Sequence, residues 1–317
     1  MQVFRSLDAF PHGRPVSLTL GTFDGVHLGH RRIIERTVST AEEIGGRAVL
    51  MTFDPHPREV IGRKGDPTYL LTSVEERLAL LQETELDACI VLPFTRDLSV
   101  LDASTFFQEY IVRRLHATRV VVGVDHAFGK GRAGNAEALK QLGESHGVGV
   151  TVVSELLMNG VKVSSTAIRN VLGQGNVGKA WDFLGRPYSL SGIVVRGEGL
   201  GTRLGFPTAN LELRTSDKLL PSNGVYIVRV RCNGQSYDAI MNIGRRPTVS
   251  EQMHISLEVH IFTFSGDLYG MHMQVELLER LREEIRFDSS TQLAAQIQSD
   301  TEIALAYFKR EKNRIND

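Results

Sequence analysis

The chain has 317 residues, a formal net charge of −1 at neutral pH, 42% hydrophobic residues and 23% charged residues. These proportions are typical of a globular protein and exclude a disordered chain, while the length favours two domains. A near-neutral charge gives no global reason to bind nucleic acid, and no apolar run approaches the roughly 18 residues that a spanning helix needs.

The first half of the chain alternates strand-like and helix-like patterns. The run VSLTL alternates polar and apolar residues and is expected to be a half-buried strand, and Ser73 and Glu76 have the spacing of a capping box. Strands separated by crossover helices predict a parallel, Rossmann-like sheet whose ligands bind beyond the carboxyl ends of the strands. Strands are expected at 16–23, 47–53, 88–94, 118–124 and 148–154, and helices at 31–44, 73–83, 102–115 and 135–146.

The pattern changes at residues 185–188, where a short helix ends and a turn with Pro187 begins. This change predicts one domain over 1–185 and a second over 186–317. Short strands separated by Gly, Asn and Asp turns then indicate a small antiparallel barrel. In the closing helix at 291–310, one face carries apolar residues that should pack on the barrel: Leu293, Ile297, Ala304 and Phe308. The barrel strands are expected at 188–195, 224–232, 235–243, 255–264 and 271–279.

The stretch GTFDGVHLGH at 21–30 joins the first predicted strand to the first predicted helix. Such a turn attracts phosphate through free N–H groups and the helix dipole, and Gly25 and Gly29 let a ligand approach the backbone. An ordinary structural turn remains an alternative. So does a zinc site of His27 and His30 with Asp24 or His56, although the spacing is not that of HExxH.

The segment GQGNVGKA at 173–180 nearly fits two nucleotide-binding motifs. Both motifs require a strand directly before them, whereas STAIRNVL reads as a helix. The glycines are therefore expected to form a break between two short helices.

The two cysteines, Cys89 and Cys232, stand in strand-like runs far apart in the sequence. Each is expected to be a small core or edge residue and not half of a disulfide. A reducing, cytoplasmic compartment fits this use of cysteine.

Taken together, these motifs resemble the bacterial bifunctional riboflavin kinase/FMN adenylyltransferases, also called FAD synthetases. FDGVHLGH, FDPHP, VGVDHAFGKGRAG and SSTAIR resemble the four motifs of the adenylyltransferase half in order. GFPTANL, MNIGRRPTV, LEVHIFTFSGDLYG and RFDS resemble the riboflavin kinase module in order. The resemblance covers nearly the whole chain, and eight motifs in sequence are far more specific than any one of them.

In the first half, the resemblance implies an HxGH nucleotidylyltransferase that transfers AMP from ATP to FMN and releases pyrophosphate. It implies that His27 and His30 are catalytic, because they can donate hydrogen bonds to ATP oxygens as negative charge builds up. It also implies a flavin pocket at His56, Pro57 and Phe128. The remaining motif residues are expected to bind ATP: Gly21, Thr22, Phe23, Asp24, Gly29, Gly123, Asp125, Ser165, Thr166 and Arg169. Taken alone, SSTAIR would be an ordinary helix N-cap.

In the second half, the resemblance implies that riboflavin is phosphorylated by ATP, with Glu258 accepting the hydroxyl proton. Thr208 and Asn210 stand two apart, so in an extended segment both oxygens project on one side, where they can share Mg²⁺ with ATP phosphates. Residues 196–205, RGEGLGTRLG, would form a lid over those phosphates. The expected ATP-binding residues of the kinase are Gly197, Gly199, Gly201, Gly205, Thr208 and Asn210.

The resemblance further implies the small molecules that the chain handles. These are riboflavin, FMN, FAD, ATP, ADP and pyrophosphate; the flavins are substrates and products, and Mg²⁺ enters with ATP. No nucleic acid, membrane or protein partner is expected. Two positions depart from the family's usual pattern: His126 replaces a more frequent aromatic residue, and Arg31 replaces a Gln after the HxGH.

Three other functions stay open at this stage. The first half could transfer a nucleotidyl group to another phosphate ester, although PTAN and LEVH argue against it. The chain could be a flavin- or RNA-binding regulator without turnover, and the absence of basic-aromatic clustering weakens the RNA version. A zinc hydrolase is the third.

Overall fold

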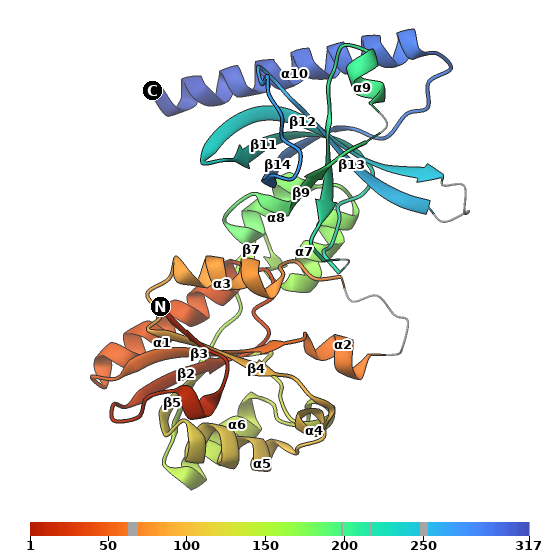
Figure 1. The fold of residues 1–317 in the computed structure, drawn as a ribbon. Helices are drawn as coiled ribbons and strands as arrows, with labels where there is room; N and C mark the ends of the chain where they lie inside the picture. Colours follow the sequence, from red (N-terminus) through yellow and green to blue (C-terminus); the bar gives the residue numbers. More distant parts are fainter. Residues whose placement is uncertain (63–68, 198, 216, 248–252, 317) are drawn as a thin grey trace. The chain divides into compact units, whose positions relative to one another are not determined.

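A computed structural model describes residues 1–317 except 63–68, 198, 216, 248–252 and 317. The chain divides into two compact units, Met1–Ser165 and Thr166–Asp317 (Figure 1). Within the described residues, no helix has the length and hydrophobicity that crossing a membrane requires.

The first unit is built on a six-stranded parallel sheet with the order β1-β4-β3-β2-β5-β6. Its strands are β1 Gln2–Phe4, β2 Val16–Leu20, β3 Arg47–Asp54, β4 Ala88–Pro93, β5 Ala117–Gly123 and β6 Gly149–Val153. A small hairpin of β7 Leu157–Met158 and β8 Val161–Lys162 follows. The predicted parallel α/β fold is confirmed, and β1 is an edge strand that the sequence pattern did not reveal.

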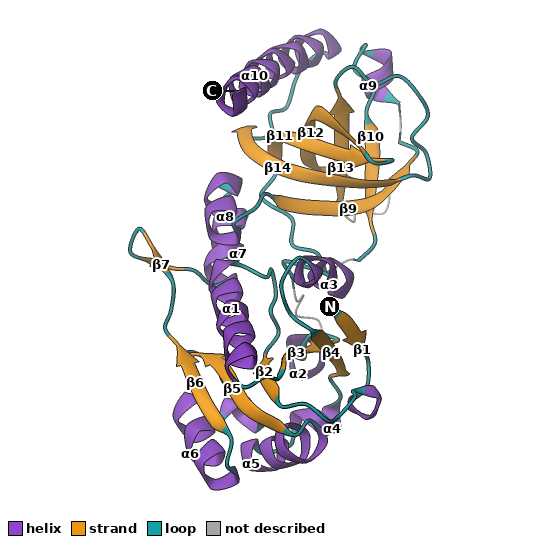
Figure 2. Ribbon diagram, turned by 90° about the vertical axis from the view of Figure 1, so that its left-hand side faces the viewer, coloured by secondary structure: helices purple, strands orange, loops and turns teal. Residues whose placement is uncertain are grey.

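Helices cover both faces of this sheet (Figure 2). On one face pack α1 Leu28–Glu43 and α3 Val74–Gln82; on the other pack α5 Ala103–Phe106, the π-helix η2 Phe107–Arg114 and α6 Ala136–His146. The capping box of Ser73 and Glu76 is confirmed at the start of α3. Shorter helices are η1 Leu7–Ala9, α2 Pro57–Ile61, α4 Arg96–Ser99 and η3 Lys130–Arg132.

Strand β2 lies at the centre of the sheet, between β3 and β5. All five of its residues are buried, including the polar Ser17 and Thr19. The expectation of a half-buried strand is therefore wrong: the alternation is real, but helices cover both faces, so the polar side chains lie in the interior as well.

The second unit contains a closed antiparallel barrel with the strand order β10-β13-β12-β11-β14-β9. The predicted antiparallel barrel is confirmed, and β10 is a sixth strand that the sequence pattern did not reveal. Its strands are β9 Tyr188–Val195, β10 Ala209–Leu213, β11 Gly224–Cys232, β12 Gln235–Pro247, β13 Met253–Ile261 and β14 His272–Arg282. The short helix α9 Leu200–Arg203 lies between β9 and β10. Along β9 every second residue is buried, so alternate side chains fill the barrel interior.

The closing helix α10, Ser290–Asn316, packs on the outside of the barrel. Its buried Ala304 and Phe308 contact Val225, Ile227 and Ile240 of the strands, and Ile297 is partly buried beside them. The predicted apolar face is thus confirmed at Ile297, Ala304 and Phe308.

Helices α7 Ser165–Gly173 and α8 Val177–Leu184 flank the predicted break at the glycine-rich segment, which is confirmed. Trp181 of α8 packs in the same cluster as α10, so α8 packs with the barrel. The carbonyl oxygen of Leu172 in α7 accepts the N–H of Ser222 at 3.1 Å. The second compact unit accordingly begins before the domain boundary expected at 185/186, while β9 begins at Tyr188, as predicted. Cys89 in β4 and Cys232 in β11 are both free and buried.

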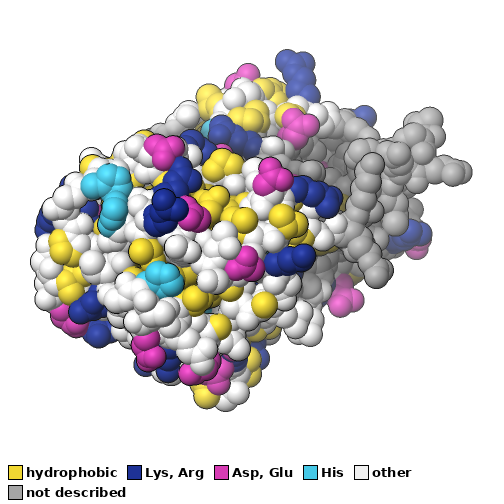
Figure 3. Space-filling model, turned by 90° about the horizontal axis from the view of Figure 1, so that it is seen from below, with side chains coloured by type: hydrophobic (Ala, Val, Ile, Leu, Met, Phe, Trp, Pro, Cys, Tyr) yellow, Lys and Arg dark blue, Asp and Glu magenta, His cyan; other side chains and the backbone are white. Residues whose placement is uncertain are grey.

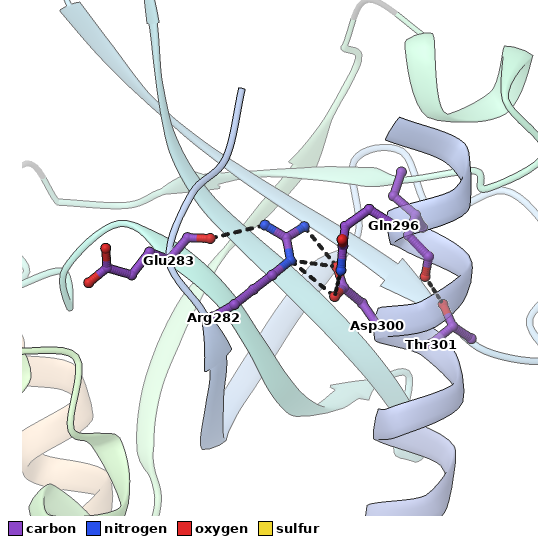
Figure 4. A network of polar contacts seen from close by, with 6 residues as sticks. Arg282, Glu283, Gln296, Asp300 and Thr301 are labelled. Carbon is purple, nitrogen blue, oxygen red and sulfur yellow. Dashed lines mark hydrogen bonds and ion pairs between the residues drawn. The ribbon is translucent and has the colours of Figure 1, made fainter. Parts of the chain in front are cut away.

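A polar network holds α10 against the end of β14 (Figure 4). Arg282 donates from Nε to both carboxylate oxygens of Asp300 at 3.0 Å and from Nη2 to Oδ2 at 2.8 Å. Gln296 Nε2 donates to Asp300 Oδ1 at 2.9 Å. The Asp300 side chain is only 3% exposed and that of Arg282 17%, so each charge depends on the other for compensation.

Replacing Asp300 with Ala should lower the free energy of unfolding by about 3 kcal/mol, because it leaves the Arg282 guanidinium buried without its carboxylate. Trp181, the one tryptophan of the chain, lies in the cluster under α10 and reports this transition by fluorescence during urea unfolding. Glu302→Ala is the matched control, since Glu302 is exposed on the same helix. Equal urea midpoints for the two variants would contradict the stabilising role of the Asp300 carboxylate beside Arg282.

Candidate functional site

The turn between β2 and α1 lies at the carboxyl end of the central strand and carries the sequence-predicted residues of the first motif. Two residues in this turn, Phe23 and Val26, have left-handed backbone φ angles of 49° and 39°. Val26 is fully buried, and a β-branched residue in this region is strained. Such strain persists only where the surroundings fix the backbone, and it is typical of functional turns.

His27 and His30 lie together at the start of α1. His27 is the N-cap, and its Nδ1 accepts the backbone N–H of His30 at 3.2 Å. That bond places the neutral ring's proton on Nε2, which is then a donor. The two rings are stacked with centroids 3.6 Å apart. A Cβ on Gly29 would lie 3.2 Å from His27 Nδ1 and 3.3 Å from the carbonyl oxygen of Val163, so glycine fits this tight approach.

Asp24 is 2% exposed and faces the backbone of residues 71–72. Its Oδ1 accepts the N–H groups of Leu71 and Thr72, both at 3.0 Å, and the Thr72 hydroxyl at 3.2 Å. The Asp24 carbonyl accepts from Ser165 Oγ at 2.9 Å. The structure therefore shows Asp24 linking three segments around the turn.

Thr22 has its carbonyl oxygen turned into the protein. It accepts from Thr52 Oγ1 at 3.1 Å and from Arg77 Nη1 at 2.5 Å. Gly21 lies beside Phe23, whose ring would be 3.4 Å from a Cβ at Gly21. Sequence reasoning missed Arg77, because a single Arg on an amphipathic helix has no distinguishing pattern.

The second motif, FDPHP, follows β3. His56 is buried and is the N-cap of α2, where its Nδ1 accepts the N–H of Arg58 at 3.2 Å and Glu59 completes a capping box. Pro57 is the first residue of this helix. The preceding Asp54–Pro55 peptide bond is cis. The carboxyl ends of β2 and β3 thus carry the first two motifs at the same edge of the sheet.

The third motif begins at the end of β5, next to β2, and Gly123 is the last residue of the strand. Asp125 forms an ion pair with Lys162 of β8, which also pairs with Glu155 at 3.1 Å. Phe128 is buried, and its ring stacks on that of His126 with centroids 5.7 Å apart. Sequence reasoning did not single out Lys162.

Residues of the fourth motif divide between the two units. Ser165, the first residue of α7, belongs to the first unit and donates to the carbonyl oxygen of Asp24. Thr166 and Arg169, further along α7, belong to the second unit. Arg31, the departure after the HxGH, pairs with Glu83 at 3.2 Å.

In the barrel, Glu258 stands between two polar residues on neighbouring strands. The register pairs it with Asn210 of β10 on one side and with Asn242 of β12 on the other. Directly opposed residues share a face, and Ile240, two residues before Asn242, packs under α10 on the outside. These three polar side chains therefore lie on the outer face of the barrel. Sequence reasoning missed Asn242, which only the strand register reveals.

The loop at 196–205 lies against this polar face. A Cβ on Gly197 would lie 2.1 Å from Asn210 Nδ2, and one on Gly201 would lie 3.0 Å from Thr208 Oγ1, so neither position admits a side chain. Gly199 and Gly205 have left-handed φ angles of 69° and 86°. The lid residues, with residue 198 outside the described range, are thus next to the two predicted Mg²⁺ ligands.

Arg196, at the start of this loop, places its guanidinium 5.2 Å from the ring centroid of Tyr269. The side chain thus covers an aromatic ring of the segment after β13.

No three His, Cys, Asp or Glu side chains gather to hold a metal ion in the part of the chain that the structure describes. His27 and His56 both use Nδ1 to accept backbone N–H groups. The zinc alternative finds no ligand set among these residues.

Comparison with known proteins identifies families for both halves. The family model described as FAD synthetase matches residues 10–167, and the one described as riboflavin kinase matches residues 184–308. Two curated relatives are named bifunctional riboflavin kinase/FMN adenylyltransferase. The protein of Pseudomonas fluorescens is 36% identical over 307 residues, which cover 96% of this chain and 97% of its own. The protein of Escherichia coli strain K12 is 37% identical over 292 residues, with 92% of each chain covered.

A solved crystal structure, named as a macrolide-efflux protein from Streptococcus pneumoniae, matches 95% of this chain and 97% of its own with a TM-score of 0.87 and 31% identity. It shows that both compact units occur together in a known structure. The two family matches and the full-length relatives agree with the motif order in the sequence. The chain therefore belongs to the family of bifunctional riboflavin kinase/FMN adenylyltransferases.

Proposed function

We propose that the chain phosphorylates riboflavin with ATP to give FMN and then transfers AMP from a second ATP to FMN, giving FAD and pyrophosphate. The observation that carries this proposal is the presence of both sites on one chain. One unit holds the stacked His27 and His30, and the other holds Glu258 in register with Asn210.

In adenylyl transfer, a phosphate oxygen of FMN attacks the α-phosphorus of ATP, and the bond to the bridging oxygen of pyrophosphate breaks. No covalent enzyme intermediate is needed, so positioning and charge stabilisation carry the reaction. His27 donates from Nε2 and, with His30, stabilises the negative charge that builds up on the phosphate oxygens. Gly29 leaves room for the phosphates at the start of α1.

We assign further contacts of ATP to the remaining motif residues. Ser165, Thr166 and Arg169 hold the triphosphate, and the planar guanidinium suits phosphate geometry. Asp125 contacts the nucleotide, and its ion pair with Lys162 breaks when the nucleotide binds. The backbone around Asp24 binds ATP while its carboxylate keeps the turn in place. The other backbone contacts come from Gly21, Thr22, Phe23 and Gly123.

In the kinase step, the ribityl hydroxyl of riboflavin attacks the γ-phosphorus of ATP, and ADP leaves. Glu258 accepts the hydroxyl proton as the new P–O bond forms. Its position on the outer barrel face, next to Asn210 and the loop at 196–205, supports this role. The loop's glycines let its backbone approach the phosphates, with Gly197, Gly199, Gly201 and Gly205 providing the close contacts.

The residues present suit Mg²⁺. Thr208 and Asn210 offer a hydroxyl and an amide oxygen, the hard neutral ligands that this ion accepts when phosphates and waters complete its octahedron. Gly197 and Gly201 let the loop backbone come close to these two side chains, where a Cβ would clash with them. When bound with ATP, Mg²⁺ neutralises phosphate charge.

We place the flavin of the adenylyltransferase half at His56, Pro57 and Phe128. The loop carrying Phe128 also holds His126, where the family more often has an aromatic residue. His126 is half-buried, and its buried Nε2 has no hydrogen-bond partner among the described residues. Burial lowers the pKa of His126 from 6.5 to about 4, with a smaller contribution from Arg132, so the ring is neutral at pH 7.

We assign residues 1–185 to adenylyl transfer and 186–317 to the kinase, since the SSTAIR motif lies at the start of α7 and the barrel follows it. A cytoplasmic location fits the two free cysteines. Acidic and basic side chains are intermixed on the face shown in Figure 3, which supports small molecules as ligands in preference to nucleic acid.

Chromatographic separation of flavins over time tests the function directly. Purified protein incubated with riboflavin, ATP and Mg²⁺ should form FMN first and FAD later. FMN that accumulates without FAD would contradict adenylyl transfer to FMN and favour another phosphate ester as the acceptor. Absence of any product, with FMN also supplied directly, would favour a flavin-binding protein without turnover.

Glu258→Gln should lower the rate of FMN formation by about 10³-fold, because the amide cannot accept the hydroxyl proton. FAD formation from supplied FMN should continue at the wild-type rate. Glu276→Gln is the matched control, since Glu276 lies on β14 and pairs with Arg231. Loss of both activities together would count against two separate sites.

His30→Ala should lower the rate of FAD formation from FMN by about 10²–10³-fold, because the developing phosphate charge loses a donor. Riboflavin phosphorylation should be unchanged. His146→Ala, an exposed histidine at the end of α6, is the control. Unaffected adenylyl transfer in the His30 variant would remove this residue from the mechanism.

His126 should make stability depend on pH. Its pKa is about 4 in the folded protein and 6.5 when unfolded, so between these values the unfolded state binds more protons and stability falls as the pH decreases. From pH 7.5 to 5, the free energy of unfolding should fall by about 2 kcal/mol more in the wild type than in His126→Phe. Urea unfolding followed by circular dichroism measures it, and equal pH dependence in both proteins would refute it.

A further inference from the structure

Arg77 lies in the interior of the first unit although it is charged at neutral pH. It belongs to α3 and is 2% exposed. Its Nη1 donates to the carbonyl oxygen of Thr22 at 2.5 Å and to Thr52 Oγ1 at 2.8 Å, and lies 3.5 Å from the carbonyl oxygen of Phe53. One guanidinium thus bonds the ends of two neighbouring strands, directly behind the turn that carries His27 and His30.

Burying this charge is costly. Desolvation lowers the pKa of Arg77, and the carboxylates of Asp24 and Asp54 oppose that shift. A buried charge contributes little net stability, because desolvation offsets the attraction to its partners. Arg77 is therefore poorly explained as a source of stability and better explained by the geometry that it imposes.

The bond to Thr22 fixes the orientation of one peptide group. A peptide unit is planar and trans, so its C=O and N–H point in opposite directions. With the Thr22 oxygen held toward Arg77, the N–H of Phe23 points away from Arg77. The ring of Phe23 in turn lies 5.0 Å from that of His30, between centroids. The contacts thus run from Arg77 through the Thr22–Phe23 peptide to the His30 ring.

A second tie joins the same part of the chain to the same turn. The residues just before α3 donate to Asp24, as described above, and the N–H of Gly25 donates to Thr72 Oγ1 at 3.0 Å. Residues 71–77 therefore hold the turn at Thr22, Asp24 and Gly25. The left-handed Phe23 lies between these fixed points.

We propose that Arg77 is a positioning residue for adenylyl transfer: it fixes the Thr22–Phe23 peptide and so holds His30 and the N–H of Phe23 in the reactive geometry. The proposal rests on the function proposed above. Loss of the guanidinium leaves the substrate-binding groups in the chain but lets the turn move. Misplacing catalytic groups by about 1 Å can cost about 10²-fold in rate.

The test measures kcat and KM for FAD formation in full-length Arg77→Met and Arg77→Lys. The Met variant should lose at least tenfold in kcat while KM for ATP and FMN changes by less than twofold, and riboflavin phosphorylation by the same protein should be unchanged. Lys keeps the charge and one donor but not the planar fork, so its kcat should lie between those of Met and wild type. Unchanged kcat in both variants would overturn the proposal.

Two further variants separate positioning from stability. Thr52→Val removes a second bond to the Thr22 carbonyl without changing side-chain size, and it should also lower kcat. Asp87→Ala removes the acceptor of the Ala48 N–H, at the amino ends of β3 and β4 and far from the turn at 21–30. It should therefore lower the melting temperature without changing kcat. A fall in kcat that tracks the melting temperature across all four variants would reduce Arg77 to a structural residue.

Amide hydrogen exchange gives a readout that does not depend on activity. In Arg77→Met, or in Arg77→Lys if the Met variant does not fold, the segment at 21–30 should exchange at least tenfold faster, and the barrel strands should be unaffected. If the segment at 21–30 of the variant exchanges at the wild-type rate, the proposal is overturned even if the variant forms no FAD. Absence of FAD in the wild type would instead contradict the proposed function alone.

Discussion

The first unit depends on one constraint: the chain must turn from β2, a strand that is buried on both faces, into α1. The turn must not block the end of the sheet at which the carboxyl ends of the strands lie. The polar backbone groups of that turn lie in the interior and need partners. Thr52, Arg77 and Ser165 donate to its carbonyl oxygens, and Thr72 accepts the N–H of Gly25. Because these side chains come from separate segments, the turn is fixed from several directions, and the strained φ of Val26 persists.

In the barrel, it is the strand register that fixes the positions of the polar groups. The barrel interior is filled by alternate apolar side chains, and α10 covers the part of the outer surface around Ile240. The polar residues Asn210, Glu258 and Asn242 occupy neighbouring positions on the three strands β10, β13 and β12. A rigid sheet thus sets the spacing of these groups, while the glycine-containing loop beside them can approach closely.

Much of the fold could be predicted from the sequence, because its signals are local. The bounds of β9 and β11 agree with their alternating runs, and the helix break at 173–180 follows from its glycines. β1 has only three residues and exists through its pairing with β4, so it has no local signal. Likewise, the motifs located the turn at 21–30, but the contacts of Asp24 and Arg77 join residues about 50 positions apart, which no spacing rule reports.

The two free cysteines have a consequence for how opening of each unit can be followed. Cys89 is fully buried in the first unit, and burial raises its pKa to about 12; burial also raises the pKa of Cys232 in the second. Alkylating reagents react with the thiolate, so both thiols are protected while their units are closed. Since each unit carries a single thiol, the rate of alkylation at each position gives an independent chemical measure of how often that half of the chain opens.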